Sequence, residues 1–544
     1  MGNLSVNVKK TINYLRENGL KATAIEVQDR LSGKKEVYEP VHPSEAELLK
    51  QRRLSGDFPY RPLISVVVPL YNTDERFLKA LIECVEAQSY DNWELILADG
   101  SEKEGLADVV RTVSENKEHP EGVSAVSINN KVRYHKLDVN YGISGNTNHA
   151  LEFAKGDYVA LLDHDDLLEK NALFEVVSAI NRVDADAADH ADANGAGHRD
   201  AGAADHADAD AADRRNAGAA RHIDVIYTDE DRCGESGDDF YNPVRKCDFN
   251  FEYLLSNNYI CHLVVMKASL IKKLELRKEF SGAQDHDLLL RAAVLGSSFY
   301  HIPKILYHWR VFGNSTSGNT SGKLYAYEAG KKAAAQALSG ILQDTELLSQ
   351  KDKNAGTASE KVCEAGEYFH VYRTRHVGVY GFDFEKSPMD TEFKAPFGNA
   401  GAVGGLVVRK NKEGIIVGGP SDFAGECEYL GKRAAAGGKG NSRFCMREVS
   451  GLDLRNICLS KEARGIFKEV VGVSYEDVPL NVKYDLSAGD DISYTKIHDW
   501  ERIFDVSVLP ENADITALSE KLSEALKAAG YKLLYLPSWE SVVQ

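Results

Sequence analysis

The segment LLDHDD places three aspartates, Asp163, Asp165 and Asp166, directly after a run of apolar residues. A buried strand that ends in closely spaced carboxylates offers the hard oxygen ligands that Mg²⁺ or Mn²⁺ prefers, and such an ion can bridge to a diphosphate. The alternative is that Asp165 or Asp166 caps a helix that begins near Leu168. The segment by itself leaves both interpretations open.

Polar residues also follow the other strands expected in the amino-terminal half. In open α/β sheets, ligands bind beyond the carboxyl ends of the strands, where the loops converge. Neither G-x-G-x-x-G nor a P-loop follows the first strand, which excludes those two ways of holding phosphate. We therefore expect one site at this edge, formed by residues after four strands: Pro69, Tyr71 and Asn72, then Asp99, then Asp138 and Asn140, and then the three aspartates.

The elements that must position these residues alternate between short apolar runs and amphipathic segments. ISVVVPL, WELILAD, VRYHKLD and YVALLD are typical of strands, and FLKALIECVEAQ, NHALEFAKG and ALFEVVSAI are typical of helices. In the first helix, Leu78, Leu81, Ile82 and Val85 form one apolar stripe. The alternation predicts an α/β fold with right-handed βαβ units and a mostly parallel sheet.

Composition divides the chain further. Residues 1–60 predict a helical lead-in to an α/β domain over 61–345. Within that domain, residues 183–221 consist almost entirely of Ala, Asp, Gly, His, Asn and Arg, which predicts a disordered surface insertion. A linker over 346–367 leads to a second region, 368–544. There, NICLSKEARGIFKEVV and LSEALKAAGYKLLYLP weakly repeat HLVVMKASLIKKLELR and LLLRAAVLGSSFYHIP, which predicts a partial duplication.

The charge balance and the cysteines exclude several classes of protein. Lys and Arg number 65 against 83 Asp and Glu, a formal net charge of −18, which argues against nucleic-acid binding. No apolar run approaches the roughly 20 residues of a membrane span, and the amino terminus has no signal-peptide pattern. A cytoplasmic protein is expected, with peripheral association at the inner face of a membrane left open. The eight cysteines form no C-x-x-C pair, so no disulfide framework or zinc knuckle is expected.

Five segments, in order along the chain, resemble the family 2 glycosyltransferases with a GT-A fold: PLYN, ILADGS, NYGISGNTNHALEFAKGDYVALLDHDD, GAQDHDLLLR and YHWRVFGNSTS. The resemblance spans about Leu63 to Ser317, apart from the insertion, and its specificity comes from the ordered set. It implies a Rossmann-like, mostly parallel central sheet with flanking helices. It also implies a metal-dependent, inverting hexosyltransferase that moves a sugar from a nucleotide-diphosphate sugar to a glycan acceptor in cell-surface polysaccharide synthesis.

The resemblance implies roles for the residues that match its motifs. Asp285 would be the catalytic base, and Asp163, Asp165 and His308 would ligate Mn²⁺ or Mg²⁺. Thr147 stands where the family frequently has an Arg, a departure at a phosphate contact. The UDP- or dTDP-sugar donor would contact a larger set: Pro69, Tyr71, Asn72, Asp99, Asn140, Gly142, Asn148, Asp163 and His164.

The chemistry of sugar transfer makes sense of these roles. A divalent cation acts as a Lewis acid for the departing diphosphate. A carboxylate accepts the proton of the attacking hydroxyl, an effect worth about 10²–10⁴-fold in rate. One base opposite the leaving group gives direct displacement and therefore inversion at the anomeric carbon.

Several assignments have a structural alternative. Asp285 and Asp287 could be first-turn carboxylates that interact with the helix dipole, and Asp99 could bind its own turn as an Asx turn. His308 could be a packed, hydrogen-bonded side chain. The segment TDEDR, residues 228–232, is either an acceptor contact or a solvated turn.

The C-terminal region resembles the latter half of a second transferase module, as in two-module surface-polysaccharide transferases, and is expected to be an α/β or α+β accessory module. ISVVVPLYN and LLDHDD have no second counterpart, and ALSEKLSEAL has Ser519 and Lys521 where GAQDHDLLLR has carboxylates. Neither side chain can be an anionic base. A non-catalytic module for acceptor binding, docking or self-association is expected.

Two rival functions fit the sequence less well than glycosyl transfer does. A sugar nucleotidylyltransferase needs a Gly- and Arg/Lys-rich loop after the first strand, and PLYNTDERF has none. A catalytically inactive glycan-binding or scaffold protein has no need for unpaired carboxylates such as Asp163, Asp165 and Asp285 beside a phosphate pocket. The expected partners are the donor and a glycan or lipid-linked glycan acceptor, with a homo-oligomer left open.

Overall fold

In the computed structural model, the described residues are 38–102, 104–115, 131–194, 223–312, 324–349, 369–373, 379–384, 400–409, 416–418, 421, 445–475, 509–510 and 513–543. The lead-in is therefore described only from Tyr38 onward, where α2 (Glu45–Gly56) is the expected helix. Ser44 caps α2 by accepting a hydrogen bond from the Glu47 amide. A hydrogen bond of 2.8 Å from Ser89 to Gln51 ties α2 to the α/β domain.

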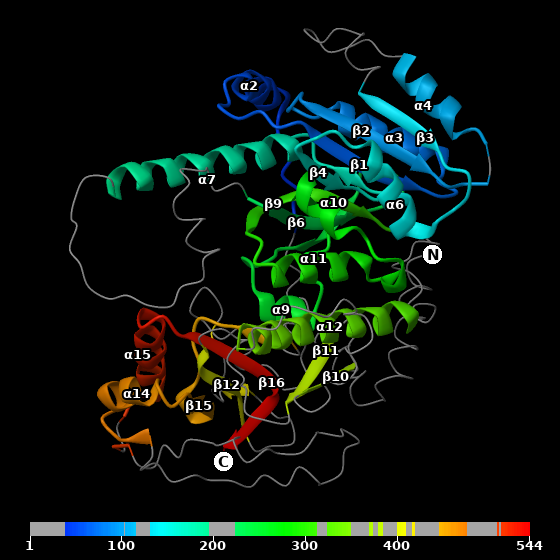
Figure 1. The fold of residues 1–544 in the computed structure, drawn as a ribbon. Coiled ribbons are helices and arrows are strands. Elements are labelled where there is room, and N and C mark those ends of the chain that lie inside the picture. The colour runs from blue at the N-terminus through cyan, green and yellow to red at the C-terminus, as the bar shows by residue number, and fades with distance from the viewer. Residues whose placement is uncertain are drawn as a thin grey trace.

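Nine strands of the described residues form the main sheet, in the order β3-β2-β1-β4-β8-β6-β9-β5 with β7 beside β6 (Figure 1). The strands are β1 Ile64–Leu70, β2 Trp93–Asp99, β3 Val132–Lys136, β4 Tyr158–Leu161, β5 Leu167–Leu168, β6 Val225–Cys233, β7 Phe240–Val244, β8 Val264–Lys267 and β9 Phe299–Arg310. β1 to β4 are parallel, as are β6 and β9, whereas β8 runs antiparallel to its neighbours β4 and β6. Six strands share one direction and β5, β7 and β8 oppose it, which confirms the mostly parallel α/β sheet.

Helices cover both faces of the main sheet. On one face lie α3 (Glu75–Glu86), α4 (Leu106–Glu115) and α7 (Ala172–Asn194); on the other lie α6 (Gly142–Phe153), α10 (Ala268–Leu274), α11 (Gln284–Val294) and α12 (Leu324–Ser349). Val66 and Val67 of β1 point to opposite faces and join the two cores. The stripe expected on α3 is confirmed, because Leu78, Leu81, Ile82 and Val85 are all fully buried. Burial of each such side chain stabilises the fold by about 1.5–3 kcal/mol.

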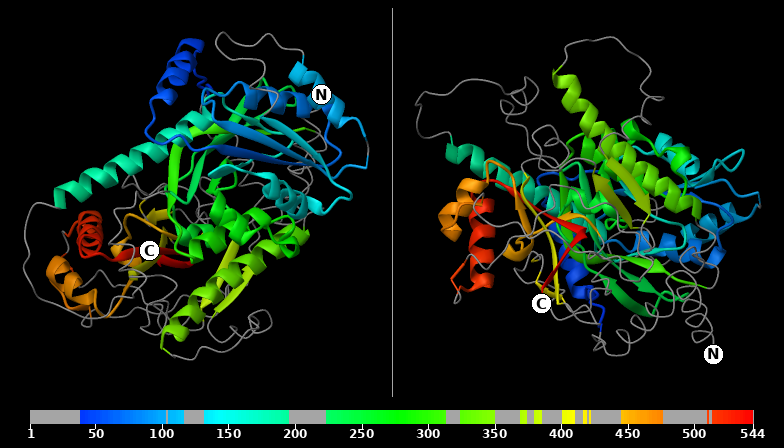
Figure 2. Two further views of the ribbon diagram at one scale, coloured as in Figure 1. Left: turned by 45° about the horizontal axis from the view of Figure 1, so that its top comes forward. Right: turned by 90° about the horizontal axis from the view of Figure 1, so that it is seen from below.

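Two expected boundaries differ from the structure. α7 continues to Asn194, so the first part of the insertion expected to be disordered over 183–221 is helical; its remainder lies outside the described residues. Alanine, the best helix former, recurs through this stretch and extends the helix. α7 projects beyond the sheet in both views of Figure 2. α12 likewise continues to Ser349, past the expected domain end at residue 345.

The C-terminal region contains a second sheet, in the order β13-β12-β16-β14 with β15 beside β12. Its strands are β12 Ala400–Arg409, β13 Ile416–Gly418, β14 Arg447–Glu448, β15 Ile457–Leu459 and β16 Lys532–Val543, with helices α14 (Arg464–Val471) and α15 (Ile515–Ala528). β12 is parallel to β16 and antiparallel to β13 and β15. The same relations join β6 to β9, β7 and β8. This agreement supports the expected partial duplication.

The C-terminal sheet meets the α/β domain at α9 (Phe251–Ser256). The Asn250 side chain donates to the Glu448 carbonyl at 2.9 Å and accepts from the Glu448 amide at 3.2 Å. Lys532 forms ion pairs of 3.3 Å with Glu252 and Glu448. Figure 1 shows α9 and α12 between the main sheet and the C-terminal strands, which include β10 (Phe369–Arg373) and β11 (Tyr380–Phe384) beside α12.

Across the described part of the chain, no helix combines the length and apolar character that a membrane crossing requires.

Candidate functional site

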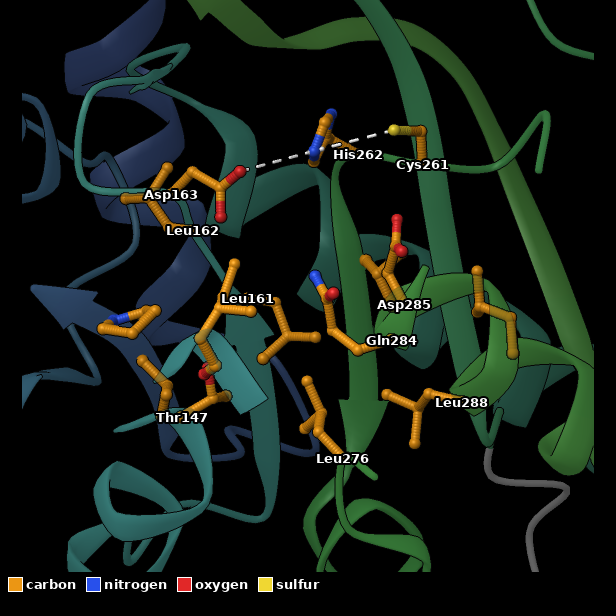
Figure 3. A pocket seen from close by; sticks show the side chains of 15 residues that line it. Thr147, Leu161, Leu162, Asp163, Cys261, His262, Leu276, Gln284, Asp285 and Leu288 are labelled. Carbon is orange, nitrogen blue, oxygen red and sulfur yellow. Dashed lines mark hydrogen bonds and ion pairs between the residues drawn. The ribbon is translucent and has the colours of Figure 1, made fainter. Parts of the chain in front are cut away.

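A pocket lies where the carboxyl ends of β1 and β4 meet the amino-terminal end of α11 (Figure 3). Apolar side chains form most of its wall: Val67, Pro69, Ile143, Leu161, Leu162, Val264, Leu276, Leu288 and Leu289. Its polar lining residues are Thr147, Asp163, Cys261, His262, Gln284 and Asp285. Pro69, Asp163 and Asp285, all expected at the site from sequence, therefore meet in one pocket although the chain separates them widely.

Asp163 follows the carboxyl end of β4 and lies next to His262. Its Oδ2 is 3.7 Å from His262 Nε2, and its side chain is 45% exposed. Partial burial raises the pKa of Asp163 above its ordinary value; the Asp165 carboxylate adds to the rise, and His262 offsets only part of it. Clustered carboxylates that repel one another favour a positive charge between them. Their hard oxygens fit a divalent cation.

Asp166 has a structural role instead. It is buried and accepts hydrogen bonds from the Tyr307 hydroxyl at 2.6 Å and the Arg310 amide at 2.7 Å, which ties the loop after β4 to β9. The alternative that Asp165 or Asp166 caps a helix near Leu168 is wrong, because β5 follows them and α7 begins only at Ala172. Asp165 is not among the pocket-lining residues.

Asp285 and Asp287 lie in the first turn of α11 but face different surroundings. Asp285 lines the pocket. Asp287 is 1% exposed and pairs with Arg277, at 3.0 Å from Nε, and with Arg291, at 2.9 Å. The α11 N-cap is Ala283, and no side chain caps that end. Asp287 is therefore a structural carboxylate in the first turn of α11, which is the alternative given above. Asp285 instead lines the pocket.

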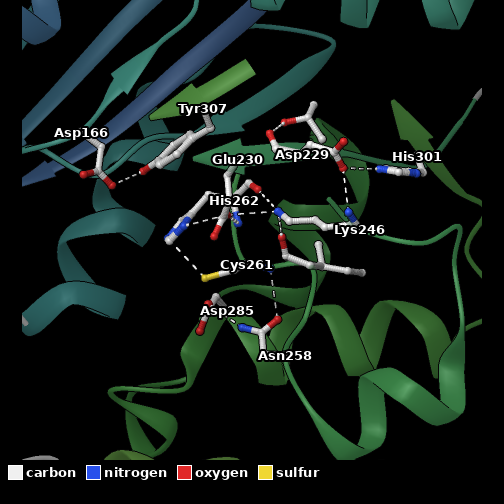
Figure 4. A network of polar contacts seen from close by, with 12 residues as sticks. Asp166, Asp229, Glu230, Lys246, Asn258, Cys261, His262, Asp285, His301 and Tyr307 are labelled. Carbon is white, nitrogen blue, oxygen red and sulfur yellow. Dashed lines mark hydrogen bonds and ion pairs between the residues drawn. The ribbon is translucent and has the colours of Figure 1, made fainter. Parts of the chain in front are cut away.

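Asn258 forms hydrogen bonds with both the Asp285 side chain and the Cys261 backbone (Figure 4). Its Nδ2 donates to Asp285 Oδ2 at 2.8 Å, and its Oδ1 accepts from the Cys261 amide at 3.3 Å. Cys261 has a φ of 45°, in the left-handed region that a side chain rarely adopts. Such backbone strain persists only where neighbouring contacts impose it. Asn258 is one such contact, and it orients Asp285 at the same time.

His308 lies in β9, outside the group of residues that line the pocket. Its Nδ1 is 2.6 Å from Asp231 Oδ1 and its Nε2 is 3.5 Å from Glu169 Oε2. Burial alone would lower the pKa of His308, but the carboxylates of Asp231 and Glu169 outweigh burial and raise it to about 9. Both ring nitrogens face these carboxylates, so the structure does not bring His308 together with Asp163 and Asp165. The expected alternative, a packed and hydrogen-bonded histidine, describes it.

Asp99 ends β2 and is fully buried. Its Oδ1 accepts from the Ser101 amide at 2.8 Å, which is the Asx turn given as its alternative, and its Oδ2 accepts from Tyr134 at 2.5 Å. Burial would raise the pKa of Asp99, but these bonds and Lys136 hold it below its ordinary value. Asp99 is not among the residues that line the pocket.

Tyr71 and Asn72 follow β1 on the same edge of the sheet. The Tyr71 side chain is exposed and free to contact a ligand. Asn72 has a φ of 48°, and its amide donates to the Ser101 hydroxyl at 2.7 Å, which joins the ends of β1 and β2. Both residues therefore border the open edge expected from the sequence.

The start of α6 is built from asparagines that bind the backbone. Asn140 accepts from the Gly142 amide at 2.9 Å, and Gly142 has a φ of +75°. Asn148 exchanges two hydrogen bonds with the Leu276 backbone, at 2.8 and 2.9 Å, so it joins α6 to the loop after α10. Asn146, not singled out from the sequence, is buried and accepts from the Tyr141 amide at 3.0 Å.

His164 follows Asp163 in the same loop, as expected for a residue near the donor. Its Nδ1 is buried and has no hydrogen-bond partner among the described residues. A buried nitrogen without a partner is costly unless a ligand or water satisfies it. This observation is compatible with a ligand contact at His164.

The TDEDR segment is neither a solvated turn nor an exposed contact, because it lies in β6 and its carboxylates are buried. Asp229 pairs with His301 at 2.9 Å, and Glu230 pairs with Lys246 at 3.1 Å. Glu230 Oε2 also accepts from the amide of His262, a residue that lines the pocket, at 3.2 Å (Figure 4). Each of these carboxylates therefore has a polar partner inside the fold, which allows an acidic strand to be buried.

Cys261, His262 and Gln284 line the pocket but were not singled out from the sequence. Gln284 stands beside Asp285 in GAQDHDLLLR, so the motif itself was a signal for it. Cys261 and His262 precede β8, and β8 is antiparallel to β4, so its first residue Val264 pairs with the last residue of β4, Leu161. Residues before β8 thus share an edge with residues after β4.

Comparison with known proteins agrees with these features. The profile of the family described as Glycosyl transferase family 2 matches residues 65–204. The O-antigen biosynthesis protein RfbC of Myxococcus xanthus is 28% identical over 53% of this chain and 19% of its own length. The putative teichuronic acid biosynthesis glycosyltransferase TuaG of Bacillus subtilis is 31% identical over 21% of this chain and 40% of its own length. The chain thus spans less than half of either relative.

Among solved structures, the fragment 1–349 of S. aureus TarS in complex with UDP is 16% identical, covers 54% of this chain and 73% of that chain, and gives a TM-score of 0.33. Similarity at this level leaves the activity open. The mixed α/β sheet with helices on both faces is itself the GT-A arrangement that the sequence resemblance implied. Residues 65–204 match the profile of glycosyl transferase family 2, and the fold that surrounds them is the one that the sequence resemblance implied.

Proposed function

We propose that this chain is a metal-dependent, inverting glycosyltransferase that moves a sugar from a nucleotide-diphosphate sugar to a glycan acceptor. The observation that carries the proposal is the meeting of Asp163 and Asp285 in one pocket, from the end of β4 and the start of α11. Asp163 lies near the Asp165 carboxylate, and Asp285 accepts a hydrogen bond from the side-chain amide of Asn258. These are the two environments that a leaving diphosphate and an attacking hydroxyl require.

Asp163 and Asp165 would hold Mn²⁺ or Mg²⁺, since their hard oxygens lie among like charges. Such an ion, when bound, stabilises the negative charge of a departing diphosphate. His308 was expected as a third ligand, and its contacts with Asp231 and Glu169 argue for leaving it out of this site. His262 and His164 are the imidazoles beside Asp163.

Asp285 would accept the proton of the acceptor hydroxyl. Asn258 donates to Oδ2 of Asp285, which fixes the carboxylate and leaves Oδ1 for the hydroxyl. A fixed base converts an encounter into a positioned attack, so it contributes through both orientation and proton transfer. Attack from the side of α11, opposite the diphosphate near Asp163, would invert the anomeric carbon.

The donor would be a UDP- or dTDP-sugar and the acceptor a surface glycan or lipid-linked glycan. The names of the relatives RfbC and TuaG refer to O-antigen and teichuronic acid biosynthesis, which supports a role in surface-polysaccharide synthesis. The apolar wall of the pocket, with Leu161 and Leu276 among its members, is suited to an apolar face or substituent of the donor sugar.

The test separates donor binding from transfer. Asp285→Asn should keep the Kd for the donor in the presence of Mn²⁺ and lower the transfer rate by about 10²–10⁴-fold. Donors are first identified by thermal shift across nucleotide sugars, because binding to the folded state raises its Tm. Asp108→Asn, on the exposed part of α4, is the matched control and should leave both quantities unchanged. Transfer by Asp285→Asn at the parent rate would refute the base.

A further inference from the structure

A second cluster of imidazole and carboxylate side chains lies outside the pocket, where the lead-in meets the main sheet. His42 belongs to the lead-in before α2, Glu169 follows β5, and His308 lies in β9. One potential ligand atom from each residue lies within 4.8 Å of the other two. None of the three residues lines the pocket, so the cluster is not part of the site described above.

Glu169 stands at the centre of the cluster. Its Oε2 lies 2.5 Å from His42 Nδ1 and 3.5 Å from His308 Nε2. Glu169 and His308 are almost fully buried, whereas the His42 side chain is 41% exposed. Phe240 packs against both imidazoles, with ring centroids 4.8 Å from His42 and 4.6 Å from His308. The three potential ligand atoms therefore lie close together, on the buried side chains of Glu169 and His308 and the partly exposed side chain of His42.

Asp231 holds His308 from the opposite side. Asp231 Oδ1 lies 2.6 Å from His308 Nδ1, and the Tyr38 hydroxyl donates to Asp231 Oδ2 at 2.7 Å. A carboxylate that accepts from Nδ1–H orients the ring, and a metal ion at Nε2 would displace the proton that this nitrogen otherwise carries. Nε2 is the atom that faces Glu169. Asp231 thus contacts one ring nitrogen of His308 and leaves the other for an ion. Metal-bound histidines are commonly oriented by a carboxylate in this way.

We propose that His42, Glu169 and His308 bind a zinc ion or another late first-row divalent ion, with Asp231 orienting His308. Two imidazole nitrogens and one carboxylate oxygen are ligands typical of Zn²⁺, whereas Mg²⁺ prefers oxygen ligands alone. Asp231 and Glu169 are both buried carboxylates, so a cation bound at Nε2 of His308 would replace the positive charge that the protonated imidazole otherwise supplies. The ion ties the lead-in to β5, β6 and β9. This site is independent of the proposed transfer reaction.

The experiment titrates the full chain with Zn²⁺ in a large excess of Mg²⁺, which occupies sites made of oxygen ligands. Calorimetry and metal analysis after gel filtration should give one bound Zn²⁺ per chain, and Tm should rise with added Zn²⁺. Co²⁺ in place of Zn²⁺ should give the visible absorption of a nitrogen-ligated cobalt ion. No bound Zn²⁺ on the unaltered chain overturns the proposal.

Three variants locate the bound ion. His42→Ala changes a partly exposed side chain and should remove both the bound Zn²⁺ and the rise in Tm. Asp231→Asn keeps all three ligands and should weaken Zn²⁺ binding by about 10–100-fold. His149→Ala is the matched control, since His149 lies on α6 with a side chain 34% exposed and outside the cluster, and it should bind Zn²⁺ as the unaltered chain does.

The Tm of each variant without metal reveals a failure to fold. If His42→Ala fails in this way, Glu169→Gln, which keeps the size of the side chain, tests the same ligand set. Zn²⁺ binding by either folded variant as tight as that of the unaltered chain contradicts the site. Loss of Zn²⁺ from Asp163→Asn would also contradict it, because that variant alters only the pocket.

Discussion

Asp163 and Asp285 are carboxylates of one pocket whose neighbours set different chemistry for each. Burial raises the pKa of Asp163, the nearby Asp165 carboxylate adds to the rise, and a bound cation would favour the charged form. Asp285 accepts a hydrogen bond from Asn258 and keeps one oxygen for a substrate. Removal of the charge should therefore affect donor binding at Asp163 and the rate of transfer at Asp285.

Asp163→Asn should abolish the effect of Mn²⁺ on nucleotide binding. An amide is a weaker ligand than a carboxylate and brings no charge, so we expect the gain in UDP affinity on addition of Mn²⁺ to fall by about 10-fold or more, or ~1.4 kcal/mol. Calorimetric titrations with and without Mn²⁺ measure the gain. Asp108→Asn serves again as the control, and an undiminished Mn²⁺ effect in Asp163→Asn would rule out Asp163 as a ligand.

At the scale of elements, β6 shows how acidic residues can lie inside a sheet. Glu230 of β6 and Lys246, which follows β7, form an ion pair in which both side chains are nearly inaccessible to water. Lys246 also donates to the backbone carbonyls of Ile260 and His262, so the pair supports the segment that leads from α9 to the pocket. Stability of this segment depends on both charges.

Glu230→Gln should destabilise the chain by about 3–5 kcal/mol, since it leaves the Lys246 ammonium buried without a carboxylate. Chemical denaturation at pH 7 measures the free energy of unfolding. Glu235→Gln, on an exposed side chain of the next loop, is the control and should change it by less than about 0.5 kcal/mol. Equal stability of the two variants would show that the pair is dispensable.

The ion pair of Glu230 and Lys246 also predicts how the free energy of unfolding changes in acid. Burial would raise the pKa of Glu230, but Lys246 and His262 outweigh burial and lower it from 4.5 to about 2. A carboxyl whose pKa is lowered by folding stabilises the fold fully above about pH 4.5, and this stabilisation is lost as the pH falls toward about 2. The stability difference between the unaltered chain and Glu230→Gln should therefore shrink over this range. A difference that stays constant down to pH 2 would contradict the assignment.

The elements of the amino-terminal half could be predicted because their signals are local. The stripe on α3 and the apolar run of β1 specify a helix and a strand from neighbouring residues alone. The place of His262 in the pocket could not be predicted from local patterns. It depends on the direction of β8, which is set by its pairing with a distant strand. The setting of His308 depends on Glu169 and Asp231, which lie far from it in sequence. Side chains placed by distant partners are beyond the reach of local patterns.

On the scale of the whole molecule, the C-terminal sheet repeats the strand relations of β6, β7, β8 and β9 without any counterpart of β1 to β4 among the described residues. In α15, the helix that matches α11, Ser519 is buried and donates to the Ile515 carbonyl at 2.7 Å. We propose that this module serves acceptor binding, docking or self-association and has no transfer activity of its own.

Truncation after Ser349 tests this proposal. The shortened chain should keep Mn²⁺-dependent donor binding and slow hydrolysis of the nucleotide sugar but lose transfer to acceptor. Because truncation leaves the buried Glu252 without Lys532, the shortened chain should also carry Glu252→Gln, with the same change in the full chain as control. Transfer at the full rate by the shortened chain would show that the module is not needed for acceptor use.

The reversed direction of β8 has a practical consequence for anyone who wishes to alter donor preference. Randomised libraries that follow the usual rule would mutate only the loop after β4. Because Val264 pairs with Leu161, Cys261 and His262 line the same pocket, and their codons belong in such a library as well. Selection from a pool that omits them would sample only one rim of the pocket.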